Sequence, residues 1–201
     1  MQYQKDEVRN RIIEEALKEF NEKGYEGASI RIIAKKSNTS VGNIYKYFKS
    51  KEDLYENLIG SIYDIFIDYI KQFDKVELND NAEIIFYQLA DEIIEIFNKN
   101  SVEISILLNQ SKGTKYENCK SMFADFATRI VTEKTEYELS LKGKRLRDNF
   151  IIYLVSQSLL ESIAIIVRER SDGVEVRKLI LNLIDIFYTD ISNKLDTEDL
   201  Q

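Results

Sequence analysis

The residues best suited to chemistry lie in one basic run near the amino end of the sequence. From Ser29 to Lys51 the chain carries no acidic residue and six basic ones, namely Arg31, Lys35, Lys36, Lys46, Lys49 and Lys51. Residues 1–51 hold 11 Lys and Arg against 7 Asp and Glu, whereas residues 52–201 hold 17 against 28. Although the whole chain has a net charge of −7, this distribution predicts a polyanion site beside an acidic body.

Two short helices joined by a tight turn are expected to position this basic run. Ser29 and Ser40 are cap-type residues that each precede a short helical pattern, and Asn38 tolerates the positive φ of a turn between them. A small hydrophobic seam would hold the helices together through Ile30, Ile33, Ala34, Ile44 and Phe48. Gly42 destabilises the later helix by about 1 kcal/mol relative to Ala. Because glycine has no side chain, it would let the backbone of this helix approach another molecule closely.

This segment resembles the DNA-binding domain of the TetR family of regulators over about residues 7–58. The family pattern stands here as Ser29, Ile33-Ala34, Ser40-Val41-Gly42-Asn43-Ile44-Tyr45-Lys46-Tyr47-Phe48 and Ser50-Lys51-Glu52. The resemblance implies an all-helical homodimer in which this domain reads DNA and a C-terminal domain binds an effector. Asn43 replaces the commoner Ser or Thr of the family, so no base preference is carried over at that position.

The expected DNA contacts follow from a helix-turn-helix whose later helix enters the major groove while the earlier helix lies across the backbone. Asn43 can bond two atoms of an adenine edge. Lys51 should bind phosphate, because its charge opposes the dipole of the helix that it opens and a structural benefit is therefore not expected. The predicted DNA-binding residues are Ser29, Arg31, Ser40, Val41, Gly42, Asn43, Tyr45, Lys46, Tyr47 and Lys51. For Tyr45 a purely core role is an equal alternative.

The rest of the sequence predicts helices and no strand. Apolar residues recur at helical spacing over residues 6–23, 50–73, 83–98, 102–111, 116–139, 146–169 and 176–195. No proline interrupts these segments, and no hairpin signal competes with them. The predicted fold is all-α, with a three-helix helix-turn-helix domain over residues 1–49 and an antiparallel helical bundle over residues 50–201 that binds the effector and dimerises.

The segment from Phe150 to Val167 is apolar nearly all round, so a helix there needs two buried faces. One face can join the core, and the other predicts contact with a second copy of the chain; a large monomeric core is the alternative. Two DNA half-sites about 34 Å apart also require two recognition helices. The predicted dimer interface consists of Leu154, Ser158, Ser162, Ile165, Leu183 and Phe187.

Aromatic residues crowd the middle of the chain and could line an apolar cavity for the small effector that the family resemblance implies, with amide groups as polar anchors. Each of these residues could equally be part of an ordinary core. The predicted lining consists of Phe66, Phe86, Phe97, Asn109, Phe123, Phe126, Tyr153 and Gln157.

Composition argues against an enzyme, a metalloprotein and a secreted protein. The chain has no histidine and one cysteine, which excludes His-based triads, His-ligated zinc and an intrachain disulfide. No cofactor is expected. Cys119 is interpreted as a small buried apolar residue, with a redox sensor as the alternative. The polar start of the chain, and an apolar segment short for a membrane span, predict a cytoplasmic protein.

Together with the resemblance to the TetR family, which implies the effector, these features predict a ligand-responsive repressor that binds a palindromic operator as a dimer. The hypothesis for its regulation is that an effector favours a tilt of the helix over residues 50–73, which moves the two recognition helices off the one-turn spacing. An activator of the same fold and a non-specific architectural DNA-binding protein are the alternatives, and the latter would bind all sequences equally well.

Overall fold

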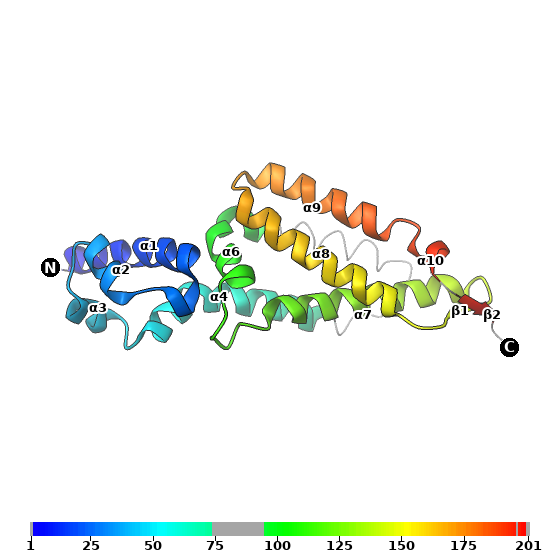
Figure 1. The fold of residues 1–201 in the computed structure, drawn as a ribbon, viewed down its shortest axis with the longest axis horizontal. Coiled ribbons are helices and arrows are strands. Elements are labelled where there is room, and N and C mark those ends of the chain that lie inside the picture. The colour runs from blue at the N-terminus through cyan, green and yellow to red at the C-terminus, as the bar shows by residue number, and fades with distance from the viewer. Residues whose placement is uncertain (1, 74–94, 196, 200–201) are drawn as a thin grey trace. The chain divides into compact units, whose positions relative to one another are not determined.

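The structure is a computed structural model that describes residues 2–73, 95–195 and 197–199 (Figure 1). Its longer helices are α1 (Gln2–Gly27), α4 (Lys51–Phe73), α7 (Cys119–Ser140), α8 (Phe150–Glu169) and α9 (Gly173–Tyr188). Its shorter elements are α2 (Ile30–Lys36), α3 (Val41–Tyr47), α6 (Ser101–Asn109), α10 (Ile191–Lys194), β1 (Lys144–Leu146) and β2 (Thr197–Asp199). The all-α prediction is confirmed. Most of the helix predicted over residues 83–98 lies outside the described residues.

One short antiparallel ribbon departs from the expectation of no strands. Residues of β1 pair with residues of β2, with Leu146 opposite Thr197, and Arg145 Nε lies 2.6 Å from Glu198 Oε1. Three-residue strands are too short to show an alternating pattern in the sequence. Because Leu146 belongs to β1, the helix predicted from residue 146 begins only at Phe150.

The chain divides into two compact units, which are described separately. The first consists of Met1–Phe66 with Asn100–Glu117, and the second of Ile67–Lys99 with Asn118–Gln201. The first unit therefore contains α1, α2, α3, most of α4 and all of α6. The functional boundary predicted at residues 49 and 50 stays a prediction.

The core of the first unit forms where the sequence pattern places it. Ile12, Ala16 and Phe20 of α1 recur every four residues and are fully buried. The seam between α2 and α3 is also buried, except that Ile30 is half-buried. The backbone of α1 is interrupted at Gly24, where φ is 68° and ψ is 170°, a conformation that favours glycine.

In the second unit α7, α8 and α9 lie side by side and alternate in direction (Figure 1). By length and by its mean hydropathy of 2.0, α8 would suffice to cross a membrane, but one of its faces is buried, at Ile152, Ser156, Leu159, Leu160, Ala164 and Val167. The helix predicted over residues 176–195 is in fact two, because the chain breaks at Asp190 with φ of 55°. Aspartate adopts this left-handed conformation more readily than most residues do.

Candidate DNA-binding site

The turn between α2 and α3 is fixed by backbone geometry and by short-range hydrogen bonds. Asn38 has φ of 52°, as its residue type predicts. The next N–H, of Thr39, donates to the carbonyl of Ala34 over 2.9 Å. Ser40 has the extended conformation of an N-cap, and its Oγ accepts a hydrogen bond from the N–H of Asn43 over 3.1 Å. The prediction that Ser40 caps the second helix of the pair is confirmed.

Ser29 precedes α2 as predicted, but its hydroxyl makes no cap hydrogen bond within the described residues. Its backbone N–H instead donates to Glu19 Oε1 over 3.3 Å. Glu19 is 1% exposed, and its Oε2 lies 3.2 Å from Lys36 Nζ. Glu19 was not among the residues predicted from the sequence. Its position three residues after Ala16 places it on the buried face of α1, which is the signal that could have identified it.

The outer face of α3 is open. A Cβ added at Gly42 would meet no atom within 4 Å. Tyr45 is 48% exposed, so a purely core role is wrong, and Ser40 and Lys46 are exposed as well. Ile44 is fully buried on the opposite side of the helix. The remaining predicted contacts of α3 are half-buried, namely Val41, Asn43 and Tyr47.

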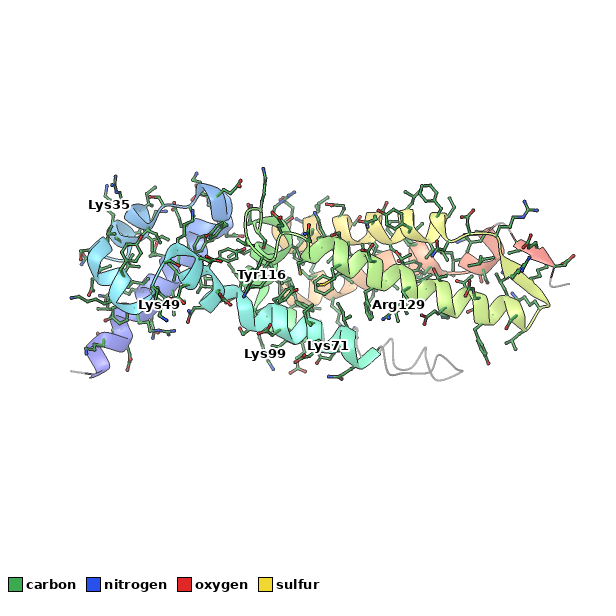
Figure 2. The ribbon with its side chains drawn as sticks, turned by 90° about the horizontal axis from the view of Figure 1, so that it is seen from below. Lys35, Lys49, Lys71, Lys99, Tyr116 and Arg129 are labelled. Carbon is green, nitrogen blue, oxygen red and sulfur yellow. The ribbon has the colours of Figure 1, made fainter. Side chains whose placement is uncertain are left out.

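Exposed basic side chains occur on α2, on α3 and directly after α3. Arg31 and Lys35 of α2 are exposed, and so are Lys46 and Lys49. Figure 2 labels Lys35 and Lys49 on the first unit. This arrangement of cations beside an open helix is suited to an anionic partner with a repeating backbone.

Lys51, like Lys36 of the same run, is held by contacts within the chain. Its Nζ donates to the carbonyl of Glu26 over 3.2 Å and lies 4.7 Å from the centre of the Tyr25 ring. Burial lowers the pKa of Lys51, and the negative charge of Glu26 partly opposes this effect. The expectation that Lys51 brings no structural benefit is therefore wrong, while its predicted phosphate contact stays a prediction.

The segment after α6 is built into the same unit as the helix-turn-helix. The N–H of Tyr25 donates to the carbonyl of Gln110 over 3.0 Å, directly beside the break at Gly24. The hydroxyls of Tyr55 and Ser111 lie 2.8 Å apart in a buried hydrogen bond. Aromatic rings extend this contact, because Tyr116 (Figure 2) lies 6.2 Å from Tyr55 and 4.9 Å from Tyr63 between ring centres. This attachment was not predicted from the sequence.

The predicted effector-pocket residues are distributed over both units. Phe66 and Asn109 belong to the first unit, and Asn109 donates from Nδ2 to the carbonyl of Ser105 in its own helix over 3.2 Å. Phe97 in the second unit is buried, and Phe86 lies outside the described residues.

The other four predicted pocket residues lie on α7 and α8. Phe123, Phe126 and Gln157 are half-buried, whereas Tyr153 is 39% exposed and stacks on Phe150 with ring centres 6.2 Å apart. A cavity of about 360 Å³ opens beside α7, but none of the predicted residues lines it. Its lining is polar and consists of Asp125, Thr128, Arg129, Thr132, Glu133 and Asn149.

The predicted dimer residues fall into two sets. On α8, Leu154 is 43% exposed and Ile165 is 49% exposed, and with exposed Ser158 and half-buried Ser162 they lie on the side of the helix opposite its buried face. On α9, Leu183 and Phe187 are half-buried and pack within the chain against the cluster of Ala124, Leu159 and Leu160.

In the part of the chain that the structure describes, Cys119 and the acidic residues show no metal-binding arrangement. Among the residues that the structure describes, no group of three or more His, Cys, Asp or Glu side chains could hold a metal ion. Cys119 is a free thiol, 2% exposed, and its burial raises its pKa to about 12. The structure therefore agrees with the interpretation of Cys119 as a small buried residue.

Comparisons of the sequence with known proteins find similarity to transcription regulators. Residues 12–58 match the family model described as "Bacterial regulatory proteins, tetR family". The chain is 34% identical to "Probable HTH-type transcriptional regulator YttP" of Bacillus subtilis (strain 168) over 89 residues, which are 44% of this chain and 42% of YttP. It is 22% identical over 158 residues to "Biofilm operon icaADBC HTH-type negative transcriptional regulator IcaR" of Staphylococcus aureus (strain Newman), covering 77% of this chain and 84% of IcaR.

Solved structures share the fold. A TetR-like transcriptional regulator from Rhodococcus sp. RHA1 aligns with a TM-score of 0.57 and 15% identity, over 88% of this chain and 92% of that one. NalD, the secondary repressor of the MexAB-OprM multidrug efflux pump in Pseudomonas aeruginosa, aligns with a TM-score of 0.52 and 16% identity, over 91% and 94% of the two chains.

Proposed function

Because the chain belongs to the TetR family of DNA-binding transcription regulators, we propose that it is a repressor that binds a palindromic operator as a homodimer and responds to a small effector. The observation that carries the DNA-binding part is the open outer face of α3, where Gly42 adds no side chain and Tyr45 and Lys46 are exposed. Its relatives are regulators and not enzymes, and a cytoplasmic location is part of the proposal.

The proposed docking places α3 in the major groove. Ser40, Val41, Gly42 and Asn43 open this helix, and in helix-turn-helix proteins the first residues of the recognition helix contact base edges. The hydroxyl of Ser29 makes no cap hydrogen bond within the described residues, which leaves it suited to a phosphate contact. Exposed Arg31 and Lys46 supply charge for further phosphate contacts, together with the hydroxyls of Tyr45 and Tyr47.

The proposed dimer uses the exposed apolar side of α8. Leu154 and Ile165 lie on one side of this helix with Ser158. Contact with a second copy would stabilise the dimer by about 25 cal/mol for each Å² of apolar surface removed from water. A two-fold dimer would also supply the second recognition helix that a palindrome requires. Repression, rather than activation, is supported by the similarity to IcaR, a negative transcriptional regulator.

The proposed response to an effector passes through α4 and α6. Helix α4 is continuous between the two units, because its residues up to Phe66 belong to the first and the rest to the second. The Tyr55–Ser111 hydrogen bond fastens α4 to the end of α6. An effector bound by the 50–201 region, among the predicted aromatic residues, would favour one orientation of α4 and so change the spacing of the recognition helices.

The test is a selection of bound fragments from random-sequence duplex DNA, followed by affinity measurements at fixed salt. The proposal expects a palindromic consensus, affinity at least about 1,000-fold above that for random duplex, and two chains per duplex in sedimentation. Equal affinity for all sequences would instead identify an architectural DNA-binding protein. A reporter gene placed behind the selected site then separates a repressor, which lowers expression, from an activator.

A further inference from the structure

The side chain of Asn43 is held by a residue outside its own helix. Its Nδ2 donates a hydrogen bond to Thr39 Oγ1 over 2.8 Å. Thr39 lies in the turn before α3, four residues upstream of Asn43, and both side chains are half-buried. The contact therefore lies at the edge of the face that the proposed function turns toward DNA.

Thr39 is a rigid partner in this contact. Its N–H is bound to the carbonyl of Ala34 over 2.9 Å, and the preceding residue, Asn38, fixes the direction of the chain with φ of 52°. Its β-branched side chain has few accessible χ1 rotamers. The acceptor Oγ1 is thus placed by the turn itself.

The backbone of Asn43 is equally fixed. Its N–H donates to both Oγ and the carbonyl of Ser40, over 3.1 Å and 3.0 Å. The next residue, Ile44, is fully buried and anchors α3 to the core. Both ends of the Thr39–Asn43 contact are therefore fixed, and in this arrangement the Asn43 carboxamide turns its NH₂ group toward Thr39 Oγ1.

A carboxamide has two N–H donors and one carbonyl acceptor. Thr39 takes one donor, which leaves Oδ1 and one N–H for a ligand. An adenine edge offers the complementary pair in the major groove, because its N6 amine donates and its N7 accepts, whereas guanine offers two acceptors. We propose that Thr39 is a specificity-determining positioning residue that holds the Asn43 amide in the orientation that reads adenine; this inference rests on the proposed function.

Loss of the Thr39 hydroxyl would release the amide. The terminal torsion of an asparagine side chain is broad and roughly two-fold, so a released amide can also turn its NH₂ group toward the two acceptors of guanine. The affinity for adenine should then fall and the affinity for guanine should rise at one base pair in each half-site. Other positions of the operator should keep their preferences.

The experiment uses the full chain and the duplex obtained by selection, with a panel in which each half-site base pair is replaced in turn. Competition binding is measured for the wild type, Thr39→Val, Thr39→Ser, Asn43→Ala and the Thr39→Val/Asn43→Ala double variant. Thr39→Val keeps the branched shape but removes the acceptor, and Thr39→Ser keeps the acceptor. Thr39→Ala replaces Thr39→Val if thermal melting shows that the latter is unfolded.

The expected wild-type preference for A·T over G·C at one pair per half-site is at least about fivefold. Thr39→Val should reduce this preference by about three- to tenfold, whereas Thr39→Ser should retain it. In the Asn43→Ala background, Thr39→Val should cause no further change in the preference. In the free protein, the Asn43 side-chain amide protons should exchange with water faster in Thr39→Val than in the wild type.

Two results would overturn the inference while leaving the proposed function intact. One is a Thr39→Val variant that keeps the wild-type A·T preference; the other is a loss of affinity spread evenly over all positions or equal in the Asn43→Ala background. A wild-type chain with no sequence preference at all would overturn this inference and the proposed function together.

Discussion

The backbone N–H of Ser29 donates to the buried carboxylate of Glu19 over 3.3 Å, which joins the middle of α1 to the first residue of the helix-turn-helix pair. The same carboxylate lies 3.2 Å from Lys36 Nζ at the other end of α2. One acidic side chain therefore fixes both ends of α2 against α1. This contact sets the position of Ser29 and Arg31, for which phosphate contacts are predicted.

Replacement of Glu19 by alanine should destabilise the fold, because it leaves the Ser29 N–H without its partner and opens a space beside α1. The expected loss is about 1–3 kcal/mol in the free energy of unfolding, measured by urea denaturation. Glu22→Ala is the matched control, since Glu22 is 59% exposed and pairs at the surface with Lys23; it should leave the free energy of unfolding nearly unchanged. Equal effects of the two variants would contradict this role of Glu19.

Gly24→Ala should also lower stability. Gly24 has φ of 68° and ψ of 170°, and an added Cβ would lie 2.9 Å from Gln110 Oε1. The expected cost is about 1–3 kcal/mol. In Gly27→Ala the new Cβ would make an ordinary 3.5 Å contact with Lys23 Cβ, so that variant should be neutral or slightly more stable. Thermal melting of both variants decides the matter, and an unchanged Gly24→Ala would refute the strain argument.

Much of the helix-turn-helix could be predicted because its determinants are local. The burial of Ile33 and Ile44 follows from helical spacing, the cap at Ser40 from residue type, and the positive φ at Asn38 from the tolerance of asparagine for that conformation. Each of these features depends on neighbours within a few positions. Periodicity and residue type are therefore sufficient to place them.

The features that escaped prediction depend on contacts between distant segments. The hydrogen bond from Tyr55 to Ser111 spans 56 positions, and β1 pairs with residues about 50 positions later in the chain. Single-sequence patterns carry no record of such partners. The structural role of Lys51 was missed for the same reason, because its acceptor, the carbonyl of Glu26, lies 25 positions upstream.

Lysine variants should separate phosphate binding from structural support. Both Lys46→Ala and Lys51→Ala should weaken binding to every DNA sequence and flatten the salt dependence by about one unit for each phosphate that a subunit no longer neutralises. Only Lys51→Ala should also lower stability, by about 0.5–1 kcal/mol, because it removes the interactions with the Glu26 carbonyl and the Tyr25 ring. If Lys51→Ala lowers stability but leaves the salt slope unchanged, Lys51 is a structural residue alone.

Cys119 should be inert to thiol reagents in the folded protein. Its burial raises its pKa to about 12, whereas an unfolded thiol titrates near pH 8.5. The neutral thiol thus stabilises the fold fully below about pH 8.5, and this contribution is lost as the pH rises toward about 12. Alkylation at pH 8, followed by mass spectrometry, should be slow in buffer and fast in denaturant. Rapid alkylation of the native protein would favour the redox-sensor alternative.

The most direct test of the proposed DNA binding is the affinity of Gly42→Leu for the selected operator, measured by fluorescence anisotropy beside its thermal melting curve. Because an added Cβ at Gly42 meets no protein atom within 4 Å, the variant should fold with stability equal to the wild type or up to about 1 kcal/mol higher. Its leucine side chain would stand between α3 and the groove, so we predict an affinity loss of at least about tenfold, equivalent to 1.4 kcal/mol. A folded Gly42→Leu that binds the operator as tightly as the wild type would show that α3 does not enter the major groove.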